Sequence, residues 1–156
     1  MGTTIKIYLP RLMTEDEPLT ATIQQPLMGK SGNECVLVVE DDDDVRRYAV
    51  QALTSLGYRV LDAANAEGAI RIAESNPEIE LLFTDVGLPR VNGRQLAEHL
   101  RHLIPALRVL YTSGYARNAI VHNGVLDPGV ELLAKPYTIE DLARKIRQVF
   151  DSELAA

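Results

Sequence analysis

The sequence predicts an α/β fold in which helices cover both faces of a parallel β-sheet. Between residues 34 and 153, short continuous apolar runs alternate five times with stretches whose apolar residues follow helical spacing. Apolar runs without polar alternation are typical of strands buried on both faces. Alternating β and α units form parallel sheets with right-handed crossovers and helices on both sides. This part of the chain is therefore expected to form one domain.

The first half of the domain begins with a buried strand. The segment Cys35-Val-Leu-Val-Val39 is wholly apolar and is followed by acidic residues. From Asp43 onward, apolar residues recur at helical spacing until Gly57, a residue type that commonly ends helices. The next expected elements are a strand over 58–62, a helix that begins near 66 and closes at Asn76-Pro77, and a strand over 79–84.

The second half continues the alternation. Thr138 is the expected N-cap of the last helix, and Asp141, three residues on, makes a partial capping box. The elements expected before it, in order, are a loop over 85–93, a helix bearing Leu96, Leu100 and Leu103, a strand over 107–112, a short helix over 117–122 and a strand over 131–134.

Two segments precede this domain. Residues 13–33 have no sustained apolar period and contain two prolines and two glycines, which indicates a flexible linker. Before them, Thr4-Ile-Lys-Ile-Tyr-Leu9 alternates polar and apolar side chains and stops at Pro10, the pattern of a half-buried strand. Since a lone strand is not stable, we expect this segment either to be disordered or to come from a larger domain.

Composition and charge narrow the functional classes. With 46% hydrophobic and 24% charged residues, the chain resembles an average globular protein. Acidic residues outnumber basic ones by 22 to 16, but five of the acids are consecutive, from Glu40 to Asp44, and the remainder is nearly neutral. The sequence has no basic stripe, which argues against binding to nucleic acid and against direct contact with a membrane.

The sequence also predicts the compartment. Its single cysteine, Cys35, excludes an internal disulfide and favours a reducing environment. It contains neither a secretion signal nor an apolar run long enough to span a bilayer. We therefore predict a cytoplasmic location.

Reactive side chains stand where the predicted strands end. Glu40 and Asp41 follow the first strand, Asp85 the third, Thr112 the fourth and Lys135 the fifth. Parallel sheets bind ligands beyond the carboxyl ends of their strands, so these groups are expected to meet. Neighbouring carboxylates repel unless a cation lies between them, and Mg²⁺ suits a site of carboxylate oxygens that also receives a phosphate.

Asp85 differs from the acid pair because it stands alone at a junction between strand and loop. Its carboxylate can act there as a nucleophile toward phosphorus. Phosphoryl transfer depends on positioning and charge neutralisation, which Mg²⁺, the Lys135 ammonium and the Thr112 hydroxyl can provide. The sequence thus predicts an aspartate that is phosphorylated.

Four fragments resemble the response-regulator receiver domain in order and spacing over residues 34–153. The fragments are Val38-Val39-Glu40-Asp41, Thr84-Asp85 with Pro89 and Gly93, Tyr111-Thr112-Ser113-Gly114, and Ala134-Lys135-Pro136. The resemblance implies a doubly wound, flavodoxin-like sheet of five parallel strands in the order 2-1-3-4-5. It further implies that a histidine kinase phosphorylates the domain.

The resemblance also assigns residue roles. It implies that Asp85 is phosphorylated and that Asp41 binds Mg²⁺ directly, whereas Glu40 binds it through water. The Gly87 backbone carbonyl is expected to complete the protein ligands, and Lys135 to contact the phosphoryl group. By the same resemblance, the Lys135–Pro136 peptide bond is expected to be cis.

The first residues carry a second resemblance. The segment Gly2-Thr-Thr-Ile-Lys-Ile-Tyr-Leu-Pro10 is similar to the last glycine-threonine box and final strand of the histidine-kinase ATP-binding domain. An arbitrary amphipathic strand is the alternative. On the kinase interpretation, residues 1–12 are a remnant of that domain, and the chain is the C-terminal end of a hybrid sensor kinase. The receiver would then take a phosphoryl group from its own kinase core and pass it to a histidine phosphotransfer protein, or lose it to water.

Three departures from the family pattern bear on mechanism. The position three residues before the lysine, often aromatic in receivers, is Leu132, which makes aromatic switching there doubtful. The positions two after Asp85 and two after Thr112 are Gly87 and Gly114, so no side chain can orient or block an attacking water.

Two other functions remain open from the sequence. An aspartyl-phosphate phosphohydrolase also uses aspartate, threonine, lysine and Mg²⁺, but it needs a second acid where this chain has Gly87. A degenerate receiver could serve only as a docking module. Retention of all the expected reactive residues argues against it.

Overall fold

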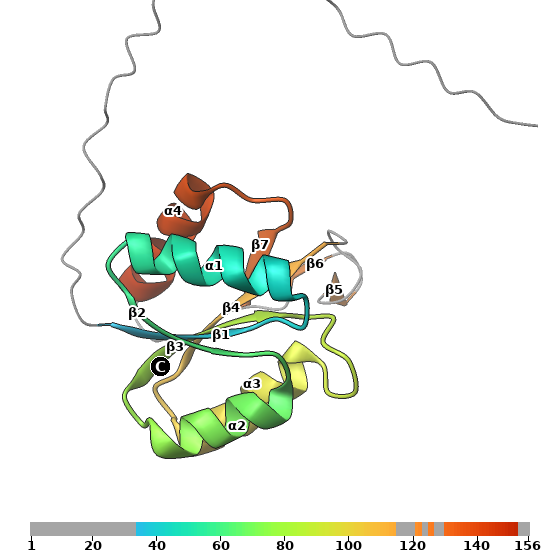
Figure 1. The fold of residues 1–156 in the computed structure, drawn as a ribbon. Helices are drawn as coiled ribbons and strands as arrows, with labels where there is room; N and C mark the ends of the chain where they lie inside the picture. Colours follow the sequence, from blue (N-terminus) through green and yellow to red (C-terminus); the bar gives the residue numbers. More distant parts are fainter. Residues whose placement is uncertain (1–33, 115–120, 123–124, 127–129, 153–156) are drawn as a thin grey trace, which may run out of the picture.

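A five-stranded parallel sheet forms the centre of the protein. The computed structural model describes residues 34–114, 121–122, 125–126 and 130–152 (Figure 1). The sheet has the order β2-β1-β3-β4-β7, which confirms the expected order 2-1-3-4-5. Its strands are β1 (Cys35–Val39), β2 (Arg59–Ala63), β3 (Ile79–Asp85), β4 (Arg108–Ser113) and β7 (Glu131–Ala134).

Helices cover both faces of the sheet, as the alternating pattern predicted. In Figure 1, α1 and α4 lie on one face, and α2 and α3 lie on the other. The bounds are α1 (Asp43–Ser55), α2 (Ala66–Ser75), α3 (Gly93–Leu103) and α4 (Ile139–Asp151). Each face has its own hydrophobic core, with β1, β3 and β4 contributing side chains to both.

Caps determine where the helices begin. The Asp42 side chain accepts hydrogen bonds from the first turn of α1, and Asn92 forms a capping box with Gln95 at α3. Thr138 and Asp141 form the capping box expected at α4. Each cap satisfies backbone N–H groups that have no partner within the helix. The cap of α1 lies in the short connection after β1, and the cap of α3 lies at the end of the loop after β3.

One element differs from the sequence prediction. A helix was expected over 117–122, but Val121–His122 is β5, which pairs antiparallel with β6 (Val125–Leu126). The dipeptide between them is Asn123-Gly124, a sequence typical of tight hairpin turns, and this signal outweighs a short helical pattern. Residues 117–120 lie outside the described residues. So do the strand and linker expected over 1–12 and 13–33.

The backbone bears out a second detail. The Lys135–Pro136 peptide bond is cis, as the resemblance implied. Among the described residues, no helix is both long and apolar enough to cross a membrane.

Candidate functional site

The carboxyl ends of four neighbouring strands bring the expected residues together. Glu40 and Asp41 follow β1, Asp85 is the last residue of β3, and Lys135 follows β7. Asp85 and Thr112 are direct Cα partners across β3 and β4. Parallel register therefore sets these side chains at one edge of the sheet.

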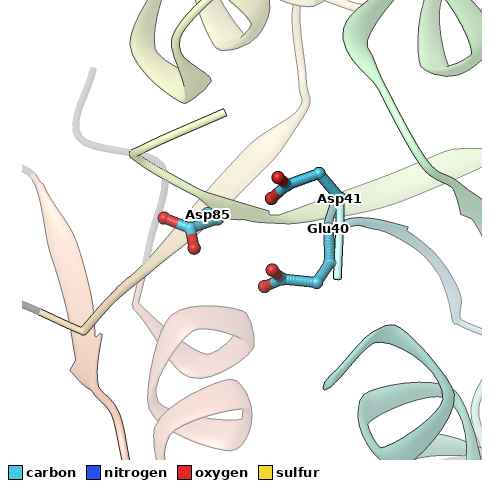
Figure 2. A group of neighbouring side chains, drawn as sticks. All are labelled: Glu40, Asp41 and Asp85. Carbon is cyan, nitrogen blue, oxygen red and sulfur yellow. The ribbon is translucent and has the colours of Figure 1, made fainter. Parts of the chain in front are cut away.

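The three carboxylates form one cluster. One carboxylate oxygen from each of Glu40, Asp41 and Asp85 lies within 4.8 Å of the other two. Figure 2 shows the side chains of Glu40 and Asp41 extending toward Asp85. Glu40 is buried, Asp41 is exposed and Asp85 is partly buried, so the cluster is open to solvent on one side.

Lys135 neutralises part of this negative charge. Its Nζ donates to Glu40 Oε2 at 2.6 Å and to Asp85 Oδ2 at 2.7 Å. Burial alone would lower the pKa of Lys135, but the hydrogen bonds and charges of Asp85 and Glu40 raise the pKa above its usual value. The ammonium therefore stays protonated beside the acids.

Burial raises the pKa of Glu40, whereas it acts to lower the pKa of Lys135. Glu40 is only 4% exposed, and desolvation raises the pKa of its carboxyl above the usual value even though Lys135 opposes that shift. The negative charge of Asp85 adds to the increase in pKa. A buried carboxylate in this position gains from any further cation that lies beside it.

Both oxygens of the Asp85 carboxylate are held. Oδ1 accepts a hydrogen bond from the Gly87 N–H at 2.7 Å, while Oδ2 accepts the bond from Lys135. The peptide N–H and the ammonium approach from different parts of the fold, one from the loop after β3 and one from the residue that follows β7. They fix the direction in which the carboxylate points.

The backbone of Asp85 is packed against Gly93, the first residue of α3. A Cβ atom on Gly93 would lie 2.3 Å from the Asp85 carbonyl oxygen, and the Gly93 N–H donates to the Val86 carbonyl at 3.1 Å. Only a residue without a side chain fits this approach. Gly93 was part of the family pattern, but only the three-dimensional structure shows why glycine is needed there: the two backbone segments are in close contact.

The hydroxyl of Thr112 is buried and has no hydrogen-bond partner among the described residues. The residue is 1% exposed, and its Oγ1 makes no hydrogen bond within the part of the chain that the structure describes. A buried polar atom of this kind costs free energy until it gains a partner. It adjoins Asp85 in the sheet, so an oxygen atom bound to Asp85 is a suitable acceptor.

The three departures noted in the sequence have structural counterparts. Leu132 is partly buried against the core on the α2 and α3 face. Gly87 is exposed, and its nearest neighbour for an added Cβ is Asp85 Oδ1 at 3.4 Å. Among the described residues, an added Cβ on Gly114 would meet nothing within 4 Å. A Cβ atom could therefore be added at either glycine without overlap with the described residues.

The donor set indicates the kind of ligand. Among the described residues, the candidate metal ligands at this edge are carboxylate oxygens, which suit a hard divalent cation such as Mg²⁺ better than a soft metal. The neighbouring ammonium and hydroxyl suit an anion with several oxygens. The site can therefore hold a hard cation and a phosphoryl group side by side.

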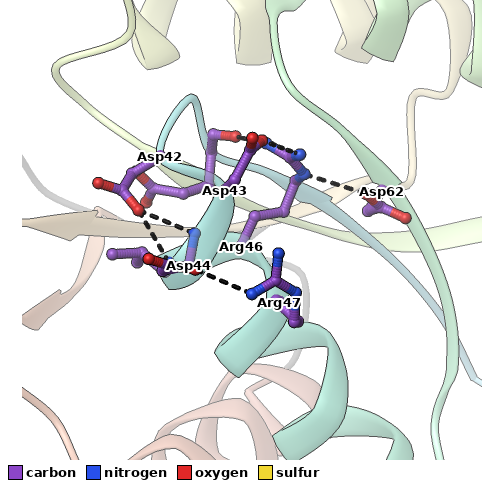
Figure 3. Close-up of polar contacts among 8 residues, drawn as sticks. Asp42, Asp43, Asp44, Arg46, Arg47 and Asp62 are labelled. Atoms are coloured by element: carbon purple, nitrogen blue, oxygen red, sulfur yellow. Dashed lines mark hydrogen bonds and ion pairs between the residues drawn. The ribbon is translucent and has the colours of Figure 1, made fainter.

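Sequence reasoning did not find Arg46. Figure 3 shows its guanidinium between Asp43 and Asp62, and it also donates to the Glu40 carbonyl oxygen at 2.8 Å. The spacing of Arg46 from Asp43 signals an ion pair within the helix. No sequence pattern indicates the contacts with Glu40 and Asp62.

With this geometry established, comparison with known proteins identifies the family. The family model described as "Response regulator receiver domain" matches residues 36–147. The chain belongs to this family. The fold and the edge at which the acids gather are those of a receiver domain.

The relatives include both stand-alone receivers and kinases. The sensor kinase CckA of Brucella abortus is 35% identical over 159 residues, a match that covers 97% of this chain and 17% of the kinase. The response regulator receiver protein CpdR of the same organism is 31% identical, over 73% of this chain and 94% of that protein. The chain thus spans about a sixth of the kinase's length.

A solved receiver matches the structure. The crystal structure of the receiver domain from the hybrid histidine kinase CckA superimposes with a TM-score of 0.64 and 36% identity. The match covers 75% of this chain and 99% of that one. The receiver fold therefore accounts for nearly all of the described residues.

Proposed function

We propose that this receiver domain accepts a phosphoryl group on Asp85 from a histidine kinase. The observation that carries the proposal is the grouping of Asp85 with two other carboxylates and with Lys135 Nζ, 2.7 Å from Asp85 Oδ2. A carboxylate oxygen of Asp85 attacks phosphorus, and the bond between phosphorus and the donor's imidazole nitrogen breaks. The electron pair of that bond returns to the nitrogen.

Mg²⁺ is the cofactor that fits this site. The carboxylates of Glu40, Asp41 and Asp85 would hold it, with the Gly87 backbone carbonyl as a further ligand. When bound, the ion offsets the negative charge that accumulates around phosphorus. Glu40 and Asp41 thus serve to hold the cation, and Asp85 both holds it and reacts.

Lys135 and Thr112 act on the phosphoryl oxygens. Lys135 already pairs with Asp85, so a phosphoryl group on that side chain can take over the ammonium as a charged partner. The buried Thr112 hydroxyl, which lacks a partner among the described residues, can donate to another phosphoryl oxygen. Both side chains would contact the negatively charged oxygens of the transferred phosphoryl group and so stabilise the charge that develops there during transfer.

The partners follow from the likeness to kinases. We propose that the receiver comprises residues 34–153 of a hybrid sensor kinase, that residues 1–12 end the kinase's ATP-binding domain, and that 13–33 link the two. The extent of the CckA match, 97% of this chain, supports this arrangement. The phosphoryl group would come from the kinase core and pass to a histidine phosphotransfer protein in the cytoplasm, or be hydrolysed.

Hydrolysis by the domain itself should be slow. A phosphohydrolase of the aspartyl-phosphate type needs an acid two residues after its nucleophile, and Gly87 offers no side chain there. The domain therefore serves as an acceptor and relay rather than as a phosphatase with repeated turnover.

The proposal is tested by incubating the full chain with acetyl phosphate and Mg²⁺ and measuring its intact mass. We expect one added phosphoryl group that hydroxylamine removes, and none in Asp85→Asn. Asp44→Asn is the matched control, because the Asp44 side chain is 90% exposed and lies in the same acidic run. Phosphorylation that persists in Asp85→Asn would show that another residue is the acceptor.

A further inference from the structure

The guanidinium of Arg46 joins three parts of the fold next to the acidic cluster. Nη1 donates to the Glu40 carbonyl oxygen at 2.8 Å, Nε donates to Asp62 Oδ2 at 3.1 Å, and Nη2 contacts Asp43 (Figure 3). The Arg46 side chain is 17% exposed, and its contact with the Glu40 carbonyl is partly buried, whereas the side chains of Asp43 and Asp62 are 74% and 49% exposed. Building on the proposed function, we propose that Arg46 is a positioning residue that sets the directions of the Glu40 and Asp41 carboxylates for Mg²⁺.

One peptide group links Glu40 to Asp41. This group is a rigid plane that consists of the Glu40 carbonyl and the Asp41 N–H, with one α-carbon at each end. The two proposed metal ligands branch from those two α-carbons. An interaction that fixes the direction of the carbonyl therefore restricts ψ of Glu40 and φ of Asp41, and with them the directions of both side chains.

The sheet alone does not hold this peptide. The parallel pairing of β1 with β3 ends at Val39, which is opposite Thr84, so Glu40 lies one residue beyond it. The Glu40 N–H still donates to the Ala63 carbonyl at 3.2 Å. The Glu40 carbonyl is satisfied by Arg46, so β2 holds one backbone group of Glu40 and the guanidinium holds the other.

Arg46 is itself anchored. Asp62 belongs to β2, where it is the register partner of Val38, and Asp43 is the first residue of α1. Because a guanidinium is planar and its donors form a fixed fork, bonds to a carboxylate and a carbonyl in different directions fix its plane. A lysine ammonium carries the same charge but lacks this fork.

Positioning and charge predict opposite effects on Mg²⁺ binding. Arg46→Ala removes one positive charge beside an acidic cluster, and on electrostatic grounds alone this change would tighten Mg²⁺ binding. Loss of positioning weakens binding, since groups that orient metal ligands typically contribute about 10- to 100-fold in affinity. The direction of the change therefore distinguishes the two.

The experiment measures Mg²⁺ affinity by calorimetry with Mg²⁺ alone, on the full chain. We expect Arg46→Ala to raise the Kd at least about 10-fold, the lower end of the range for such groups. Arg47→Ala is the matched control: it removes the same charge from the next residue of α1, where the side chain is 63% exposed and pairs with Asp44. It should leave the Kd near the wild-type value. An unchanged or lower Kd in Arg46→Ala overturns the inference.

A second variant guards against loss of folding. Arg46→Lys keeps the charge but removes the fork, so we expect its Kd to lie between those of the wild type and Arg46→Ala, with an unchanged urea midpoint. A Kd equal to that of the wild type in Arg46→Lys shows that the charge alone matters, and the inference is then wrong.

Phosphorylation separates this inference from the proposed function. With acetyl phosphate as the donor, Arg46→Ala should need more Mg²⁺ for half-maximal rate but reach the wild-type maximum at saturating Mg²⁺. A wild-type chain that binds no Mg²⁺ contradicts both proposals. A wild type that is phosphorylated on Asp85, with a Mg²⁺ requirement that Arg46→Ala does not change, contradicts only the role of Arg46.

Discussion

The contact between Gly93 and the carbonyl of Asp85 gives a sharp test of how the reactive aspartate is held. A Cβ atom at position 93 would lie 2.3 Å from that oxygen and 3.1 Å from the carbonyl carbon. Both atoms are backbone, so no side-chain rotation relieves the overlap. Gly93→Ala must move the start of α3 away from β3, or move Asp85 itself.

The expected magnitude follows from two opposing effects. Alanine at the first turn of a helix gains about 0.5–1 kcal/mol over glycine through lower entropy of the unfolded chain. Overpacking of a well-packed site costs about 1–3 kcal/mol, and the overlap here is with rigid backbone. We therefore expect the free energy of unfolding to fall by about 1–2 kcal/mol, since overpacking outweighs the gain.

Urea unfolding of the chain measures this change. With a denaturant slope of about 2 kcal/mol per molar, within the usual range for small proteins, the midpoint should fall by roughly 0.5–1 M. Phosphorylation by acetyl phosphate should also slow, because the Asp85 carboxylate moves relative to Lys135. Gly114→Ala is the control, since an added Cβ there meets no atom of the described residues within 4 Å, and it should keep the wild-type midpoint. A Gly93→Ala variant as stable as the wild type would refute the steric argument.

Two further predictions concern a strained turn and a buried thiol. Arg90 has a φ of 71° at the centre of a turn that is closed by a hydrogen bond from the Val91 N–H to the Pro89 carbonyl. Arg90→Gly should raise the urea midpoint, because relief of about 1–2 kcal/mol of backbone strain outweighs the entropy cost of glycine. A lower urea midpoint would contradict this. Burial raises the pKa of the Cys35 thiol, which is 1% exposed, so a disulfide reagent at pH 8 should label it only as fast as the domain opens. Rapid labelling without urea would contradict the buried position.

Lys135 illustrates how the resting site is balanced. In the described structure its ammonium pairs with Glu40 and Asp85 at the same time. A bound divalent cation would add a positive partner for the acids, and a phosphoryl group would add a negative partner for the ammonium. The same lysine can therefore hold the acids together before phosphorylation and face the phosphoryl group afterwards.

Much of the fold could be predicted from the sequence because its signals are local. The apolar run over 35–39, the helical spacing after Asp43 and the capping pair Thr138 and Asp141 each depend on neighbours within a few residues. The helix expected over 117–122 was wrong at 121–122, where a stronger local signal in the sequence, Asn123-Gly124, favours the pairing of β5 with β6.

The composition of the candidate site was also determined by the sequence. Residues at the carboxyl ends of parallel strands meet at one edge of the sheet whatever the details of packing. The sequence was therefore sufficient to group Glu40, Asp41, Asp85 and Lys135. Only the tertiary structure decided how they are held. Arg46 donates to the Glu40 carbonyl, and Gly93 packs on the Asp85 carbonyl. Every residue has a backbone carbonyl, so the amino-acid sequence does not indicate which one will be contacted.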